Sequence, residues 1–128
     1  MEQRWLARFL LCVAIVATLS VPALAHQGLK TGLYECWTTG NGTYANLDLK
    51  LRSRGRYVWQ LHDESWKRNG TFERNGDRLR FTGGFLKNRN FKGLLHAYND
   101  SFGYHTHVVY LYKNNYTKEN QKYDCNNN

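Results

Sequence analysis

Short runs in which apolar and polar residues alternate fill most of the chain after residue 31, and Gly and Asn separate the runs. The clearest run is Tyr44–Arg52, in which every second residue from Leu47 to Leu51 is leucine and the residues between are charged. A period of two is typical of a β-strand that buries one face. No apolar period of 3.6 residues is sustained after residue 26, so the pattern predicts an all-β domain.

The runs and the turn residues between them predict the individual strands. Strands are expected at 32–38, 44–52, 56–62, 70–74, 77–81, 91–98 and 104–113. Asn75-Gly76 is the strongest hairpin signal, whereas 63–69 and 87–90 are expected to form a turn and a loop. Connections this short join antiparallel neighbours. We therefore expect an antiparallel meander of about seven to eight strands that forms a barrel or half-barrel, followed by a polar tail at 114–128.

The first 25 residues have the three parts of a secretory signal peptide. Arg4 and Arg8 give the positive part, residues 9–21 are an apolar run, and Ala-Leu-Ala at 23–25 is a cleavage site with small residues. The run is shorter than the roughly 20 residues that a membrane-spanning helix needs. Cleavage after Ala25 would leave a secreted or periplasmic chain that begins at His26 and has no transmembrane segment. We expect a β-domain at 26–113 and a polar tail at 114–128 that is tethered by Cys125.

The cysteines predict one disulfide bond. Cys12 lies in the signal peptide, so the mature chain keeps Cys36 and Cys125. An even pair in an oxidising compartment is expected to form a bridge. The closed loop of about ninety residues gives roughly 4 to 5 kcal/mol in the chain-entropy model, as an upper figure. Two free thiols are the alternative, and a zinc site needs more ligands at short spacing.

A glycine followed two residues later by Tyr or Phe recurs at 32–34, 42–44, 55–57 and 70–72. The irregular spacing marks the starts of strands and not a repeat array. With this strand rhythm the chain resembles small secreted antiparallel barrels of the calycin type, which include lipocalin-like and avidin-like domains. The resemblance implies an up-and-down barrel with a ligand mouth. It carries over no binding residues, because Tyr34 stands where lipocalins have Trp and no helix pattern follows the last strand.

Positive charge is concentrated in the middle of the chain. Residues 50–92 hold 12 basic and 4 acidic residues, whereas the whole chain holds 18 and 10. Basic residues that alternate with the apolar series are expected on the outer face of the sheet, where they would attract polyanions such as nucleic acid, lipopolysaccharide or acidic glycans. No nucleic-acid-binding motif is present, and a solvated basic face without a ligand is the alternative. The residues expected to bind anions are Lys50, Arg52, Arg54, Arg56, Arg78 and Arg80.

The histidines suggest a metal site. His105 and His107 share one face of the last predicted strand. If Tyr98 pairs with His105, His107 lies opposite His96, and three imidazoles in this arrangement can coordinate zinc or copper. A shift of one residue would turn His96 to the other face. His26 at the mature N-terminus would be similar to the histidine brace of copper-binding secreted proteins, including the lytic polysaccharide monooxygenases. The alternative is half-exposed sheet histidines without a metal.

Catalytic chemistry has weaker support in the sequence. His62, Asp63 and Glu64, together with Arg78 or Lys92, would supply the acid and base of a ribonuclease-like secreted hydrolase. Adjacent residues of a strand point to opposite faces, however, so the three residues do not preassemble a site. No Gly-x-Ser-x-Gly elbow, phosphate loop or His-Glu-x-x-His motif occurs.

These patterns favour a monomeric, non-enzymatic module that binds an anionic or glycan-like ligand, such as a cell-envelope component. A copper- or zinc-binding protein and a secreted hydrolase are the alternatives. The non-enzymatic binding module needs no cofactor. In a eukaryotic host four Asn-x-Ser/Thr motifs would be glycosylation sites. They begin at Asn41, Asn69, Asn99 and Asn115.

Overall fold

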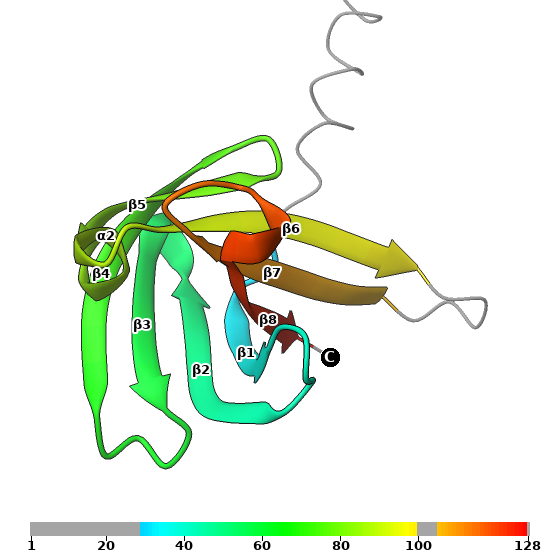
Figure 1. The fold of residues 1–128 in the computed structure, drawn as a ribbon. Coiled ribbons are helices and arrows are strands. Elements are labelled where there is room, and N and C mark those ends of the chain that lie inside the picture. The colour runs from blue at the N-terminus through cyan, green and yellow to red at the C-terminus, as the bar shows by residue number, and fades with distance from the viewer. Residues whose placement is uncertain (1–28, 100–104, 128) are drawn as a thin grey trace, which may run out of the picture.

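The structure is a computed structural model that describes residues 29–99 and 105–127. Its strands are β1 Gly32–Thr38, β2 Tyr44–Arg52, β3 Arg56–Leu61, β4 Lys67–Asn75, β5 Arg78–Gly84, β6 Phe91–Asn99, β7 His105–Lys113 and β8 Gln121–Asn127. The helical turns are η1 Ser53–Gly55, α2 Phe85–Asn88 and η2 Lys118–Asn120. Each strand pairs with the next in antiparallel fashion, and β8 returns to pair with β1, so the sheet is a closed barrel (Figure 1). This confirms the predicted fold class and is consistent with a calycin-like fold.

Three elements differ from the prediction. The segment expected to be a polar tail supplies β8, the strand that closes the barrel. The β4 strand begins at Lys67, within the segment expected to be a turn. A four-residue helix, α2, stands before β6 where a loop was expected. All three are polar or very short segments, in which the apolar period that predicts an element is weak.

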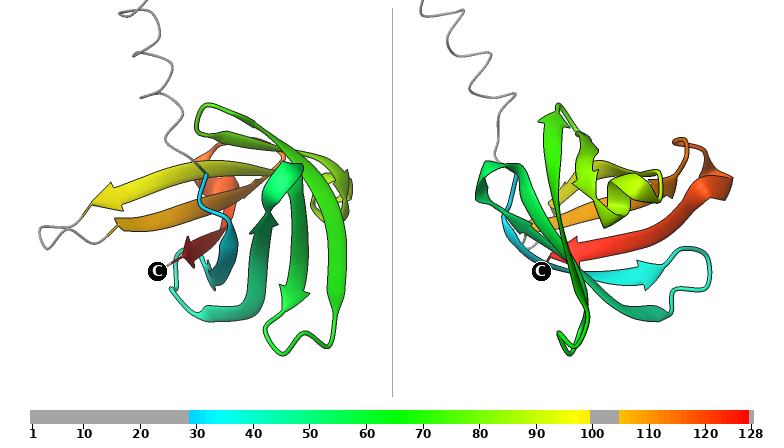
Figure 2. Two further views of the ribbon diagram at one scale, coloured as in Figure 1. Left: turned by 180° about the vertical axis from the view of Figure 1, so that it is seen from behind. Right: turned by 90° about the vertical axis from the view of Figure 1, so that its left-hand side faces the viewer.

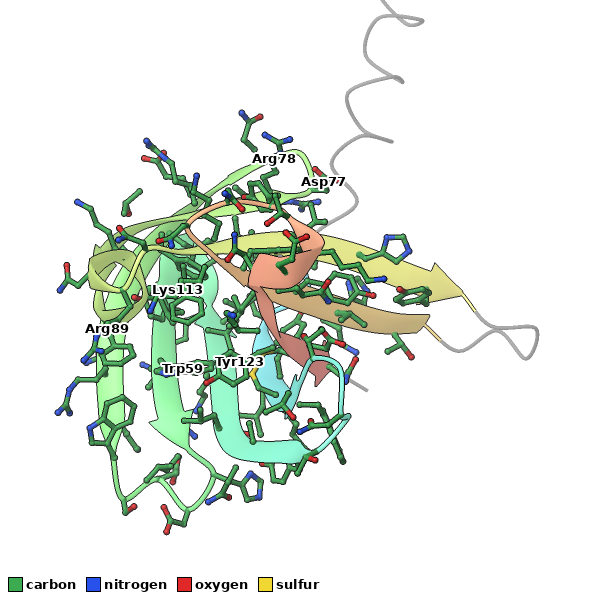
Figure 3. The ribbon with its side chains drawn as sticks, in the orientation of Figure 1. Trp59, Asp77, Arg78, Arg89, Lys113 and Tyr123 are labelled. Atoms are coloured by element: carbon green, nitrogen blue, oxygen red, sulfur yellow. A yellow bond between two sulfur atoms is a disulfide. The ribbon has the colours of Figure 1, made fainter. Side chains whose placement is uncertain are left out.

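The interior of the barrel is filled by side chains from all eight strands and α2. Large residues such as Tyr34, Tyr57 and Leu111 are almost completely buried there. Trp59 of β3 and Tyr123 of β8 face each other, with ring centroids 5.5 Å apart (Figure 3). The inward positions thus form one packed core, as in small barrels of eight strands. Side chains that are available to a ligand therefore lie on the outer face and at the ends of the barrel.

Tyr57 and α2 close one end of the core. The Tyr57 hydroxyl donates to the carbonyl oxygen of Gly83 at 2.9 Å and accepts from the backbone N–H of Leu86 at 3.0 Å. The Tyr57 ring passes so close to Gly70 that a Cβ atom there would lie 2.1 Å from Cζ of the ring. The glycine of the recurring Gly-x-aromatic pattern at 70–72 is therefore required by packing. Burial raises the pKa of Tyr57, so its hydroxyl stays protonated.

The predicted disulfide joins Cys36 of β1 to Cys125 of β8. The two residues are direct partners in the pairing of these strands, and both are fully buried. The bridge therefore crosses the seam at which the first and last strands close the barrel. It is compatible with a protein that folds in an oxidising compartment.

The β6–β7 hairpin extends outward from the rest of the barrel (Figures 1 and 2). Nine residues of β6 pair with β7, whereas three pair with β5. The second half of β6 therefore has only β7 as its strand partner among the described residues. Within residues 29–99 and 105–127, no helix has the length and apolar character needed to cross a membrane.

Candidate functional site

Two of the predicted anion-binding arginines lie in a hollow of about 460 Å³ on the outer face of β4, β5 and β6. Strand pairing builds it, because Arg80 lies between Glu73 of β4 and Lys92 of β6. Arg78 lies at the start of β5, beside the β4–β5 turn (Figure 3). We call this site the basic hollow. It is lined by Glu73, Arg74, Asn75, Arg78, Arg80, Lys92 and Tyr116.

Tyr116 forms an aromatic wall of the basic hollow. The guanidinium carbon of Arg78 lies 5.0 Å from the centre of its ring, and Nζ of Lys92 lies 5.8 Å from it. The Tyr116 hydroxyl donates to the carbonyl oxygen of Gly93 at 3.2 Å. Burial raises the pKa of Tyr116, and Arg78 opposes that rise. The neutral ring therefore holds two cations in place by cation–π attraction.

The basic hollow has an excess of positive charge. Four basic side chains line it against one carboxylate, that of Glu73. Arg80 donates to Glu73 Oε2 at 2.5 Å, but both side chains are largely exposed, so solvent screens this pair. An anion that enters the hollow can compete for the Arg80 guanidinium. The arrangement offers planar, forked donors of the kind that suit carboxylate, sulfate or phosphate groups.

The other predicted anion-binding residues are spread over neighbouring strands. Arg52 and Arg54 line a second hollow, of about 640 Å³, which shares Glu73 and Arg74 with the basic hollow. Lys50 is half-buried on β2, and Arg56 is exposed opposite Arg52 on β3. Neither of these two lines either hollow. The structure thus gathers Arg78 and Arg80, places Arg52 and Arg54 beside them, and leaves Lys50 and Arg56 outside.

Five residues that line the basic hollow were not among the predicted anion-binding residues: Glu73, Arg74, Asn75, Lys92 and Tyr116. Lys92 enters it because it pairs with Arg80 on the outer face, so the pairing of strands already predicted was its signal. Arg74 pairs with buried Leu79, so alternation gave no signal for it; it lines the hollow beside the β4–β5 turn, where its Nε donates to the carbonyl oxygen of Gly76. Tyr116 belongs to the segment expected to be a tail, where no pattern pointed to it. Its ring reaches the hollow from the loop between β7 and β8.

The predicted three-histidine arrangement is not formed. Asn99 pairs with His105, so the register is one residue away from the expected one. His96 consequently pairs with Val108, and His107 pairs with Ala97. Because successive residues alternate between faces, His96 and His107 lie on opposite faces of the hairpin. The convergence of imidazoles on which the zinc or copper prediction depended is therefore lost.

No cluster of three or more His, Cys, Asp or Glu residues suited to a metal ion occurs in the described part of the chain. His26 and the signal peptide at 1–25 lie outside the described residues. The copper brace at the mature N-terminus, like the cleavage site, therefore stays a prediction from sequence.

His62 contacts a carboxylate, but not one of those beside it in the sequence. Its Nδ1 lies 2.8 Å from Oδ2 of Asp48, whose side chain is buried, while half of the His62 side chain is exposed. Asp63 instead accepts hydrogen bonds from the N–H and hydroxyl of Ser65. The hydrogen bond and charge of Asp48 raise the pKa of His62. Sequence reasoning missed Asp48, which belongs to a regular strand and looked like an ordinary outward position.

The hydroxyl of Tyr44 also donates to Asp48, at 3.1 Å. Burial and this hydrogen bond raise the pKa of Tyr44 to about 12. The buried carboxylate thus contacts an imidazole and accepts a hydrogen bond from a phenol. A carboxylate that orients a histidine is one part of many hydrolase sites, but no serine or cysteine nucleophile contacts His62 among the interactions of residues 29–99 and 105–127.

Comparisons with models of protein families, with curated proteins and with solved structures find no match to this chain.

Proposed function

We propose that this protein is an exported, non-enzymatic module that binds an anionic ligand in the basic hollow. The observation that carries the proposal is the convergence of Arg78, Arg80 and Lys92 on one concave site with an aromatic wall. Like charges that gather on one patch repel one another, so their assembly favours a ligand that neutralises them.

The shape and chemistry of the basic hollow support binding in preference to catalysis. Its lining offers hydrogen-bond donors and positive charge, and its one carboxylate is already bonded to Arg80. The His62–Asp48 pair belongs to β2 and to the turn after β3 and is not part of this lining. Acidic groups of an extracellular or periplasmic glycan are ligands of suitable chemistry, since carboxylates and sulfates accept paired hydrogen bonds from arginine.

Salt-dependent binding to heparin, used as a sulfated glycan probe, tests the proposal. We expect the logarithm of the association constant of the wild-type protein to fall linearly with the logarithm of salt concentration. The double variant Arg78→Gln/Arg80→Gln removes two cations from the hollow, so the slope of that line should become shallower by about 1.5. Affinity measured by fluorescence anisotropy at several NaCl concentrations gives the slope.

The matched control is Lys67→Gln/Arg68→Gln, which removes the same formal charge from the other end of β4. Lys67 pairs with Glu64 and Arg68 lies over the Trp66 ring, away from the basic hollow. This control should keep the wild-type slope. Equal slopes for both double variants would mean that the net charge of the protein, and not the hollow, governs binding. Preference for single-stranded DNA over heparin would instead assign the hollow to nucleic acid.

A further inference from the structure

A third hollow, of about 420 Å³, lies on the outer face of β1, β6, β7 and β8, and its chemistry differs from that of the basic hollow. Strand pairing assembles it from distant parts of the sequence. Trp37 pairs with Asp124, which pairs on its other side with Tyr110. We call this site the aromatic groove. It is lined by Trp37, Gly42, Tyr98, Thr106, Val108, Tyr110, Asp124 and Asn126.

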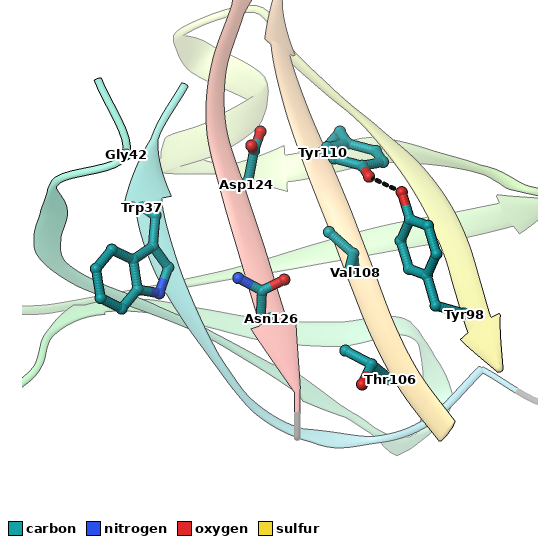
Figure 4. Close-up of a pocket in the computed structure, with 8 residues that line it drawn as sticks. All are labelled: Trp37, Gly42, Tyr98, Thr106, Val108, Tyr110, Asp124 and Asn126. Atoms are coloured by element: carbon teal, nitrogen blue, oxygen red, sulfur yellow. Dashed lines mark hydrogen bonds between the residues drawn. The ribbon is translucent and has the colours of Figure 1, made fainter. Parts of the chain in front are cut away.

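Aromatic rings form both walls of the groove. Trp37 lies on one side, and Tyr98 and Tyr110 lie on the other (Figure 4). Trp37 is 38% exposed and Tyr98 is 45% exposed, although both are large side chains that could be buried. Exposed aromatic residues that gather at one hollow indicate a contact surface for a ligand, whereas scattered ones do not.

Contacts between side chains hold both walls in position. The Trp37 ring packs against Tyr44 with centroids 5.3 Å apart, and Tyr44 is fixed by its hydrogen bond to buried Asp48. On the other side, the hydroxyls of Tyr98 and Tyr110 bond to each other (Figure 4). Rings that are already ordered lose little conformational freedom when a ligand binds. The groove is therefore preorganised.

Polar groups lie between the walls. Asp124 and Asn126 project from β8 in the space between Trp37 and the two tyrosines (Figure 4). Oδ1 of Asp124 accepts hydrogen bonds from the Thr39 hydroxyl and the Gln121 amide, each at 2.7 Å, so its carboxylate has a fixed orientation. Carboxylate and amide groups placed between aromatic rings can pair with adjacent hydroxyl groups of a ligand.

The charge of the groove separates it from the basic hollow. No Lys or Arg is among its lining residues, and its one charged side chain is the carboxylate of Asp124. An anionic ligand would be repelled there. A ring with an apolar face and several hydroxyl groups fits the aromatic walls and the polar floor together. The volume of the groove, about 420 Å³, also lies within the range of about 300–1,000 Å³ that is usual for small-ligand sites.

We propose that the aromatic groove binds an uncharged sugar ring of a glycan chain, with Trp37 and Tyr98 against the faces of the ring and Asp124 and Asn126 on its hydroxyl groups. This site is separate from the basic hollow and does not depend on it. Together the two sites would let the protein hold a glycan by a sugar ring at one place and by an acidic group at another.

Titration with uncharged oligosaccharides tests the proposal. The probes are cellohexaose, chitohexaose and xylohexaose, and the readouts are calorimetry and saturation-transfer NMR. The protein should be made in a bacterial periplasm, so that the disulfide forms while Asn41, the neighbour of lining residue Gly42, stays unmodified. We expect at least one probe to bind more tightly than about 1 mM. Trp37→Ala and Tyr98→Ala should each weaken that binding at least about tenfold, as anchoring aromatic residues do.

The matched control is Leu33→Ala. Leu33 lies on β1 like Trp37 and is 39% exposed, so the variant removes similar apolar exposure from outside the groove. It should bind sugar as the wild type does, and so should Arg78→Gln/Arg80→Gln. Failure of every probe to bind would overturn the proposal, and so would binding that survives both Trp37→Ala and Tyr98→Ala. Dimerisation that Trp37→Ala abolishes, without sugar binding, would assign the groove to a second copy of the chain.

Discussion

Removal of the disulfide bond should lower the stability of this barrel more than any other conservative change. The double variant Cys36→Ala/Cys125→Ala deletes the bridge between β1 and β8. Alanine suits the test, because both positions are fully buried and a serine would bury an additional hydroxyl group. The bridge stands at the seam that closes the barrel, where four residues of β1 pair with β8.

The expected loss follows from the length of the loop. The two cysteines are 89 residues apart, and a cross-link over about ninety residues is worth about 4.6 kcal/mol in the chain-entropy model. In a domain of about 100 residues each kcal/mol corresponds to roughly 4–8 °C in Tm. The melting temperature should therefore fall by roughly 18–37 °C, and the two sulfur atoms removed from the core add to the loss.

Thermal unfolding followed by circular dichroism gives this difference, and hydrogen exchange locates it. Amide protection should fall first in β1 and β8, since the seam opens before the paired interior of the meander. A Tm within about 5 °C of the wild type would refute the reasoning. It would mean that the packed core and the β7–β8 pairing hold the last strand without the bridge.

Three further changes test other parts of the structure. Gly70→Ala should lower the free energy of unfolding in urea by about 1–3 kcal/mol or more, because the added methyl group meets the Tyr57 ring. An unfolding midpoint equal to that of the wild type would contradict this contact. Tyr57→Phe should cost about 1–3 kcal/mol in the same assay, since Gly83 and Leu86 lose a buried partner; a neutral result would mean that water replaces the hydroxyl. For His62→Gln the prediction concerns pH. Asp48 raises the pKa of His62 above 6.5, so wild-type stabilisation is complete below that pH and is lost as the pH rises through the raised value. Urea titrations across neutral pH should show that the unfolding free energies of the wild type and His62→Gln become more similar as the pH rises. A difference between them that grows with pH would contradict the predicted direction.

The regular strands could be predicted from the sequence because their inner positions alternate strictly. The ends of β1 and β2 agree with the prediction, since the glycine before Tyr34 and the leucines of β2 mark them well. The β8 strand lacks an alternation of apolar and polar residues. The residues on either side of Cys125 are polar, and the buried residue at the end of the strand is Asn127. Asn127 is tolerated inside because its amide donates to the carbonyl oxygen of Leu33.

The candidate sites depended on register, which local patterns do not determine. A difference of one residue in the β6–β7 pairing separated His96 from His107. The same pairing brought Tyr98 and Tyr110 together across the hairpin. The aromatic groove also needed β8 to lie between β1 and β7, and β8 was not predicted. By contrast, Arg78 and Arg80 could be predicted as outward residues from alternation within β5 alone.

The most direct test of the central claim is an NMR titration with a fully sulfated heparin disaccharide. The ¹⁵N-labelled protein reports each backbone and arginine side-chain group separately. If the basic hollow is the anion site, the largest shift changes should fall on Arg78, Arg80, Lys92 and Tyr116, and they should vanish in Arg78→Gln/Arg80→Gln. Changes of equal size around Lys67 and Arg68, or no saturable change at the hollow, would contradict the account.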